Sequence, residues 1–321
     1  MAMTLVRDPD NIRLAVLGMV ENNGHPFSWS AIINGYDPSH MAQCGFNRIC
    51  QYLGDQDKEA FGIDGARVTH VWCDDPVDAS RVAAASLIPN IVDQPEAVIG
   101  QVDAVLIPTD IGHEHVSRAR PFVEAGLPVF VDKPMVDCLA DLRQFVAWVN
   151  EGKPIMSGSG MRYSPRFVEL RERIKEIGEL RLIVMTMNNS WERYAIHALE
   201  AVYPFLDPGE WSSVTNTGSG SSHVTHITHH SGVDVSVFVI DDMVGGYGHM
   251  AVYGTTGHLS AWFDDSFPAF KAQLVGYVNF LKTGHRPYPF AQTVELMKIV
   301  LAGLRSREVG GRRVAISEIE V

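Results

Sequence analysis

Lys133 is the residue of this chain whose setting most clearly suggests chemistry. It follows a short apolar run, 129–131, that is typical of a buried parallel strand, and Pro134 comes directly after it. The carboxyl ends of such strands face the crevice in which doubly wound sheets bind their ligands. Partial burial there would lower the pKa of the ammonium toward that of a useful proton donor. We therefore expect Lys133 to be catalytic, against the alternative of a solvated surface lysine.

A second candidate proton carrier is His197, which begins an apolar helical run. An imidazole at a helix start could project into a cleft and take a hydroxyl proton. The alternative is a core histidine with satisfied hydrogen bonds. Tyr194 could serve instead as a general acid or base with Lys133 lowering its pKa, and Arg193 beside it could bind an acidic substrate.

The first apolar run, 12–17, ends in a glycine-bounded turn, Gly18-Met-Val-Glu-Asn-Asn-Gly24. A dinucleotide-binding turn uses glycines so that the backbone can approach a pyrophosphate, and here Val20 occupies the place of the middle glycine. Asn22 and Asn23 would then have to donate hydrogen bonds. An ordinary strand-to-loop turn explains the segment equally well.

Two acids, Asp74 and Asp75, follow the second apolar run, 68–73. A carboxylate at this point of a Rossmann fold accepts hydrogen bonds from the adenosine ribose and repels a 2′-phosphate, which would select NAD over NADP. The acids could equally cap the following helix. The sequence therefore favours NAD without excluding NADP.

Several motifs together carry a resemblance to a known family. They are Pro108-Thr109 with His113 or His115, Asp132-Lys133-Pro134, Gly160-Met-Arg162-Tyr163, Ile196-His197-Ala-Leu-Glu200, and the closing segments from Phe270 to Val314. From about Ala104 to the C-terminus the chain resembles the Gfo/Idh/MocA oxidoreductases, which include glucose-fructose oxidoreductase and inositol dehydrogenases. The acid that this family often has four residues before the histidine is Arg193 here, which changes the proton route and leaves the substrate open.

The resemblance implies a set of site residues. The expected catalytic residues are Lys133, His197 and Tyr194, and the expected substrate-binding residues are Arg162, Tyr163 and Arg193. The expected cofactor-binding residues are Gly18, Val20, Asn23, Asp74, Pro108, Thr109, His113, Asp132, Lys133 and Pro134. It also implies a homodimer or homotetramer built through the open face of a C-terminal sheet.

The elements that must position these residues fall into two groups. Apolar runs alternate with helical patterns up to about residue 135, as βαβ units require, which predicts an N-terminal Rossmann domain with a doubly wound parallel sheet over 1–135. Segment 24–66 is too long for one crossover and is expected to be an insertion that packs on this domain. Strand-like runs joined by turns follow, so we predict a C-terminal α+β domain over 136–321 with a large, mostly antiparallel open sheet.

Composition excludes several classes of protein. The 321 residues carry 26 Lys plus Arg and 38 Asp plus Glu, a net charge of −12 without a basic run, so nucleic acid is not an expected partner. The four cysteines have no metal or disulfide spacing and are expected to be reduced thiols. We find neither a signal core nor a membrane span, and expect a cytoplasmic protein. The histidines at 223, 226, 229 and 230 fall on two faces of a strand, so no metal site is expected.

These observations predict an NAD(P)-dependent oxidoreductase acting on a sugar, a polyol or a sugar-derived hydroxy acid. Two alternatives stay open. One is a non-catalytic relative, a sensor or scaffold, suggested by the altered glycine turn. The other is a lyase or epimerase that uses tightly held NAD for transient oxidation.

Overall fold

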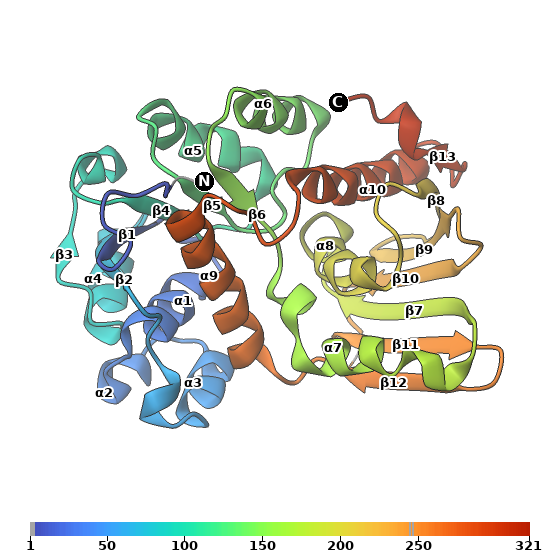
Figure 1. Ribbon diagram of the computed structural model, residues 1–321, viewed down its shortest axis with the longest axis horizontal. Coiled ribbons are helices and arrows are strands. Elements are labelled where there is room, and N and C mark those ends of the chain that lie inside the picture. Colours follow the sequence, from blue (N-terminus) through green and yellow to red (C-terminus); the bar gives the residue numbers. More distant parts are fainter. Residues whose placement is uncertain (1–3, 244, 246) are drawn as a thin grey trace.

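The computed structural model, shown in Figure 1, describes residues 4–243, 245 and 247–321. Two sheets lie side by side with helices packed around and between them. The first sheet has six strands in the order β3-β2-β1-β4-β5-β6, and the second has seven in the order β12-β11-β7-β10-β9-β8-β13.

The first sheet is parallel throughout. Its strands are β1 (Ile12–Leu17), β2 (Ala66–Trp72), β3 (Asn90–Ile91), β4 (Ala104–Ile107), β5 (Val129–Val131) and β6 (Ile155–Ser157). Their order reverses between β1 and β4, so a crevice opens at their carboxyl ends as in doubly wound folds. The expected Rossmann sheet is confirmed, and it reaches Ser157, beyond the boundary predicted at residue 135, because the run 155–157 pairs with β5.

Helices cover both faces of this sheet. They are α1 (His25–Asn34), α4 (Pro76–Ala85), α5 (His115–Glu124) and α6 (Leu139–Asn150). Leu14 and Val16 pack in one core with α1, while Ala15 and Leu17 pack in the other core with α5 and α6, as the two-residue period of a strand requires.

The segment expected to be an insertion over 24–66 is shorter in the structure. Its first part is α1, the ordinary crossover helix that packs on β1 and β2. The additional elements are α2 (Pro38–Met41), α3 (Asn47–Gly54) and the 3-10 turn η1 (Lys58–Ala60). The long segment therefore joins one standard helix to a short helical excursion.

The second sheet is mostly antiparallel, as expected, with one parallel pair, β7 and β10. Its strands are β7 (Leu180–Asn188), β8 (Trp211–Asn216), β9 (Ser222–His229), β10 (Asp234–Ile240), β11 (His249–Gly254), β12 (His258–Trp262) and β13 (Val314–Ala315). Buried residues alternate with more exposed ones along β7, β9 and β10, so one face packs in the core and the other is open.

The remaining helices join the two parts. They are α7 (Pro165–Glu172), α8 (Trp191–Val202), α9 (Ser266–Thr283) and α10 (Phe290–Glu308), with 3-10 turns η2 (Pro95–Val98), η3 (Gly112–Glu114), η4 (Gly160–Tyr163), η5 (Ile174–Ile177), η6 (Tyr203–Phe205) and η7 (Ile316–Glu318). α8 and α10 cover the inner face of the second sheet. α9 returns to the first domain, where Tyr277 shares a core with Leu14 and its hydroxyl donates to the carbonyl of Val105 at 3.2 Å.

Candidate active site

A cavity of about 390 Å³ lies where the first sheet, the inserted helix α3 and the second domain meet. It brings together four sequence-predicted residues: Asn23 from the turn after β1, Lys133 from the end of β5, and Tyr194 and His197 from α8. The other lining residues are Asn22, Asn23, Gly24, His25, Phe46, Asn47, Arg48, Ile49, Tyr52, Asp110, Asn188, Asn189, Tyr247, Phe263, Ser266 and Phe270.

Lys133 is almost completely buried, with 3% of its surface exposed. It follows β5 directly, and its peptide bond to Pro134 is cis. Its Nζ lies 3.5 Å from a carboxylate oxygen of Asp110 and 5.3 Å from the ring centroid of Tyr194. Burial acts to lower the pKa of Lys133, but the nearby carboxylates of Asp132 and Asp110 raise it above the ordinary value. The expectation of a lowered pKa was therefore wrong, and the side chain is held as an ammonium.

Asp110 is a central residue of the site that the sequence reasoning missed. It lies in the loop after β4, is 2% exposed, and accepts hydrogen bonds from Nη2 of Arg193 on both carboxylate oxygens at 2.7 Å. Burial opposes ionisation, but Lys133 and Arg193 together lower the pKa of Asp110. Arg193, which was expected to bind substrate, is thus ion-paired with Asp110, and this pair links the second domain to the first.

His197 is 5% exposed, and its Nδ1 lies 2.6 Å from Oγ of Ser159. Its Nε2 has no hydrogen-bond partner among the residues that the structure describes. Burial first, and then the positive charge of Lys133, lower the pKa of His197 well below its usual value. The imidazole is therefore neutral at physiological pH and can accept a proton at Nε2 when Nδ1–H donates to Ser159.

Tyr194 packs between the two candidate proton carriers. Its ring lies 5.3 Å from that of His197 and 6.3 Å from that of Tyr247. Because Nζ of Lys133 lies over the ring face, the observed contact is a cation–π interaction. The geometry gives Tyr194 a place in positioning Lys133, and its predicted role as acid or base stays a prediction.

His25 is the second residue that the sequence reasoning missed. It opens α1, and its Nδ1 lies 2.6 Å from Oδ2 of Asp132, whose side chain is 1% exposed. Its ring stacks on Trp29 at 4.8 Å. The sequence analysis places this stretch in an insertion, and the signal that could have identified His25 is its position as the first residue of a crossover helix.

The turn after β1 has no room for a side chain at Gly18. Gly18 has a φ of +103°, and a Cβ there would lie 2.9 Å from Thr109. The side chain of Asn23 donates to the carbonyl of Pro108 at 2.8 Å, which ties the turn to the loop after β4. At the start of the helix that follows, α1, the backbone N–H of His25 donates to the side chain of Asn23 at 2.9 Å. The N–H groups of Phe27 and Ser28 donate to the carbonyl of Gly24 at 3.1 Å, so the first turn of the helix is already hydrogen-bonded. Val20 lies within this turn and is half-buried.

Asp74 lies at the end of β2, where a ribose-binding acid was predicted. It accepts a hydrogen bond from the backbone N–H of Met19 at 3.2 Å and pairs with Arg118 at 2.9 Å. Arg118 also pairs with Glu114 at 2.8 Å. The two acids and one base leave this group with a net negative charge.

Of the predicted site residues, Asn23, Lys133, Tyr194 and His197 line the cavity, and the others do not. Arg162 is ion-paired with Glu200 and stacks on Tyr288 with its guanidinium carbon 4.0 Å from the ring centroid. Tyr163 lines a separate hollow together with Arg162. His113 is exposed and its Nδ1 lies 2.8 Å from a carboxylate oxygen of Asp137. The neighbouring His115 is fully buried between the carbonyls of Thr109 and Met135.

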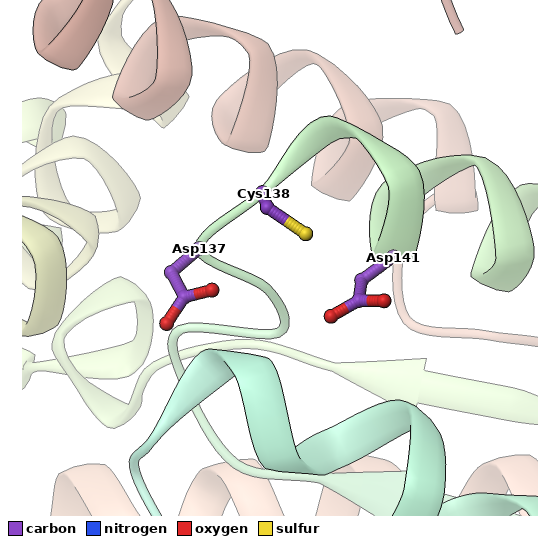
Figure 2. A group of neighbouring side chains, drawn as sticks. All are labelled: Asp137, Cys138 and Asp141. Atoms are coloured by element: carbon purple, nitrogen blue, oxygen red, sulfur yellow. The ribbon is translucent and has the colours of Figure 1, made fainter.

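Figure 2 shows the group of possible metal-binding side chains that the described residues contain outside the cavity: Asp137, Cys138 and Asp141, around the start of α6. Their ligand atoms lie within 4.8 Å of one another. Asp137 already pairs with His113, and none of the three lines the cavity. The group does not bear on the chemistry of Lys133 and His197.

Comparisons with known proteins agree with this architecture. Residues 42–158 match the family model described as "Oxidoreductase family, NAD-binding Rossmann fold". A curated relative, inositol 2-dehydrogenase 1 of Saccharopolyspora erythraea, is 31% identical over 152 residues, which span 45% of this chain and 44% of that protein. The matched part is thus less than half the length of that relative.

Two solved structures show how far the fold extends. A "probable dehydrogenase" from Thermotoga maritima superposes with a TM-score of 0.73 at 16% identity, covering 96% of this chain and 100% of that one. A myo-inositol dehydrogenase from Lactobacillus casei, solved in complex with NAD(H) and myo-inositol, gives a TM-score of 0.73 at 15% identity, covering 95% and 96%. The fold is shared along nearly the whole chain, and residues 42–158 are similar to the NAD-binding Rossmann domain of an oxidoreductase family.

Proposed function

We propose that this protein is an NAD-dependent dehydrogenase that oxidises a carbinol carbon of a polyol or polyol-derived acid, and reduces the corresponding carbonyl. The observation that carries the proposal is that Lys133 and His197, a buried ammonium and a buried neutral imidazole, line one cavity with the start of α1. The interconversion of an alcohol and a ketone needs from the protein a group that takes and returns the hydroxyl proton, and a cation that stabilises the charge on the oxygen.

The residues around the turn after β1 fit a dinucleotide. The turn with Gly18, the start of α1 and the loop of Pro108 and Thr109 would hold its pyrophosphate and nicotinamide ends, and the acid Asp74 its ribose. The net negative charge of Asp74, Arg118 and Glu114 would repel a 2′-phosphate, which supports NAD over NADP. When bound, NAD supplies the hydride acceptor or donor.

The protein's own part is to move the proton. In the oxidation, Nε2 of His197 takes the hydroxyl proton, with Nδ1–H held by Ser159. The Lys133 ammonium, kept charged by Asp110 and Asp132, stabilises the negative charge that develops on the same oxygen. In the reduction the roles reverse, and the protonated imidazole returns its proton to the alkoxide oxygen.

The charges that line the cavity favour a substrate with an acidic group over a neutral polyol. Arg48 of α3 stacks over Tyr247 at 5.0 Å, and no carboxylate pairs with it among the described residues. The two acids at the site, Asp110 and Asp132, are already paired with Lys133, Arg193 and His25. A guanidinium without a counter-ion is suited to a carboxylate or phosphate of the substrate. In Arg48→Gln we expect a raised KM for an aldonic or uronic acid and an unchanged KM for inositol, and equal effects on both would contradict this assignment.

The test begins with calorimetric titration of nucleotide-free protein with NADH and then NADPH, followed by steady-state kinetics on polyols and sugar acids. We expect NADH to bind more tightly, and Lys133→Met to lower kcat by about 10²- to 10⁴-fold while leaving NADH affinity intact. Lys298→Met, a half-buried lysine on α10 outside the cavity, is the matched control. Substrate conversion without net NADH would indicate a lyase or epimerase, and folded protein that binds neither cofactor would indicate a sensor or scaffold.

A further inference from the structure

Two free cysteines lie against each other in the segment that walls the cavity. Cys44 precedes α3 and Cys50 lies within it, and their sulfur atoms are 3.5 Å apart. The backbone N–H of Phe46 donates to the sulfur of Cys44 at 3.3 Å, and the thiol of Cys50 donates to the carbonyl of Met41 at 3.2 Å. These contacts hold the two sulfur atoms at van der Waals distance, facing one another.

The two thiols differ in their surroundings. Cys44 is 2% exposed, and burial raises its pKa to about 11, although the guanidinium of Arg81 acts in the opposite direction. Arg81 is held close by its hydrogen bond to the carbonyl of Gln43 at 2.7 Å. Cys50 is only half-buried, so an oxidant can reach its sulfur first.

We propose that Cys44 and Cys50 form a site of reversible oxidation, where a low-molecular-weight disulfide such as oxidised glutathione converts them into an intramolecular disulfide. The thiolate of Cys50 attacks one sulfur of the oxidant, and the first thiolate leaves. That thiolate takes the proton of Cys44, whose sulfur then attacks the sulfur of Cys50 and releases the second thiolate. The proton lost by Cys50 protonates this second leaving group. In total two protein thiols are oxidised to a disulfide and one small disulfide is reduced to two thiols.

The bond would close a ring around part of the cavity wall. The four residues at 46–49 lie between the two cysteines, and all four line the cavity. Oxidation also removes the thiol donor from the carbonyl of Met41. The redox state of the pair is thereby coupled to the conformational freedom of the wall that carries Arg48.

The sequence allows a direct test on the full chain. Trypsin cuts after Arg13, Arg48 and Lys58, which places Cys44 on peptide 14–48 and Cys50 on peptide 49–58. Protein equilibrated with oxidised and reduced glutathione is alkylated, digested and analysed by mass spectrometry without reduction. We expect the two peptides to appear covalently joined, to separate on reduction, and to come from protein that runs as a monomer on a non-reducing gel.

The joined peptides should be lost in Cys44→Ser and in Cys50→Ser, and retained in Cys138→Ser, a half-buried cysteine without a sulfur neighbour among the described residues. Amide hydrogen exchange over 46–49 should slow on oxidation of the wild type and not of Cys50→Ser. A stable glutathione adduct on Cys50 without joined peptides, or a disulfide between two chains, would overturn the proposal. Neither readout depends on turnover, so failure here leaves the proposed dehydrogenase activity untouched.

Discussion

At the scale of single residues, the arrangement of the site depends on which acidic side chains pair with its cations. Lys133 and Arg193 are both cations, and both meet the one carboxylate of Asp110. Removing that carboxylate would leave the partly exposed Arg193 without a counter-ion and the buried Lys133 with the charge of Asp132 alone, which is costly. The carboxylate that meets both cations thus comes from the loop after β4.

The first prediction concerns the pH dependence of His197. A base must be unprotonated to act, and burial and Lys133 lower the pKa of this imidazole below its ordinary 6.5. Activity should thus persist below pH 6.5, with the acid limb of kcat/KM for alcohol oxidation at lower pH. Replacing Lys133 by methionine removes a positive charge, so the pKa of His197 rises and the acid limb should move to higher pH.

The profile is measured by steady-state kinetics in wild type, Lys133→Met and the control Lys298→Met, which should behave as wild type. An acid limb at or above pH 6.5 in the wild type, unmoved by Lys133→Met, would remove His197 from the proposed proton transfer.

A site residue can be predicted from the sequence when its position along a strand or helix determines which way its side chain points. A residue that belongs to the site because it pairs with a distant residue is missed. Lys133 was predicted because a residue at the carboxyl end of a parallel strand must face the crevice. His197 was predicted from a motif that was expected at the start of a helix. The structure places it in the middle of α8, and brings both residues to one cavity. Asp110 and His25 were missed because their importance comes from Arg193 and Asp132, partners from distant elements that no local pattern reveals.

At the scale of elements, the packing of α3 on the start of α1 shapes the cofactor side of the cavity. Gly24 precedes α1, and a Cβ there would lie 2.4 Å from Cδ1 of Ile49 and 2.9 Å from the ring of Phe46. These side chains come from the excursion that follows α1. A single glycine thus sets how closely α3 can cover the helix end that would receive a pyrophosphate.

The second prediction follows from this contact. Gly24→Ala should destabilise the protein by about 1–3 kcal/mol, because Ile49 and Phe46 must move, and should weaken NADH binding as the start of α1 shifts. Urea unfolding and NADH titration measure the two effects. The control is Gly54→Ala at the end of α3, where a Cβ would have no neighbour within 4 Å, and there we expect a gain of about 0.4–1 kcal/mol. Equal effects at both positions would show that the contact does not constrain α3.

The predicted elements follow from apolar period and turn residues, and the apolar runs 12–17, 68–73 and 129–131 coincide within two residues with β1, β2 and β5. The excursion after α1 could not be divided correctly, because α1 is buried along most of its length and shows little amphipathic pattern. A helix that is buried on all sides lacks the alternation of apolar and polar residues by which a crossover helix is recognised in a sequence.

At the scale of the whole molecule, the cavity belongs to neither domain alone. Arg193 of α8 holds Asp110 of the first domain, and Arg48 of α3 stacks on Tyr247, between β10 and β11 of the second sheet. These contacts cross the crevice on two sides. The second domain thereby closes the site that the first sheet opens, and its outer face is left free for other contacts.

That outer face leads to the last prediction, a homodimer through the open side of the second sheet. A row of paired residues crosses it, with Val224 on β9 opposite Phe238 on β10 at one end and Trp262 on β12, 50% exposed, at the other; Thr186 and His249 lie between them. Apolar residues on an open sheet favour burial against another copy. Phe238→Glu should convert a dimer into a monomer in light scattering, because the charge would be desolvated at the contact. Val77→Glu, at an exposed valine on α4 of the first domain, should leave the mass unchanged, and a wild type that is monomeric at micromolar concentration would refute the interface.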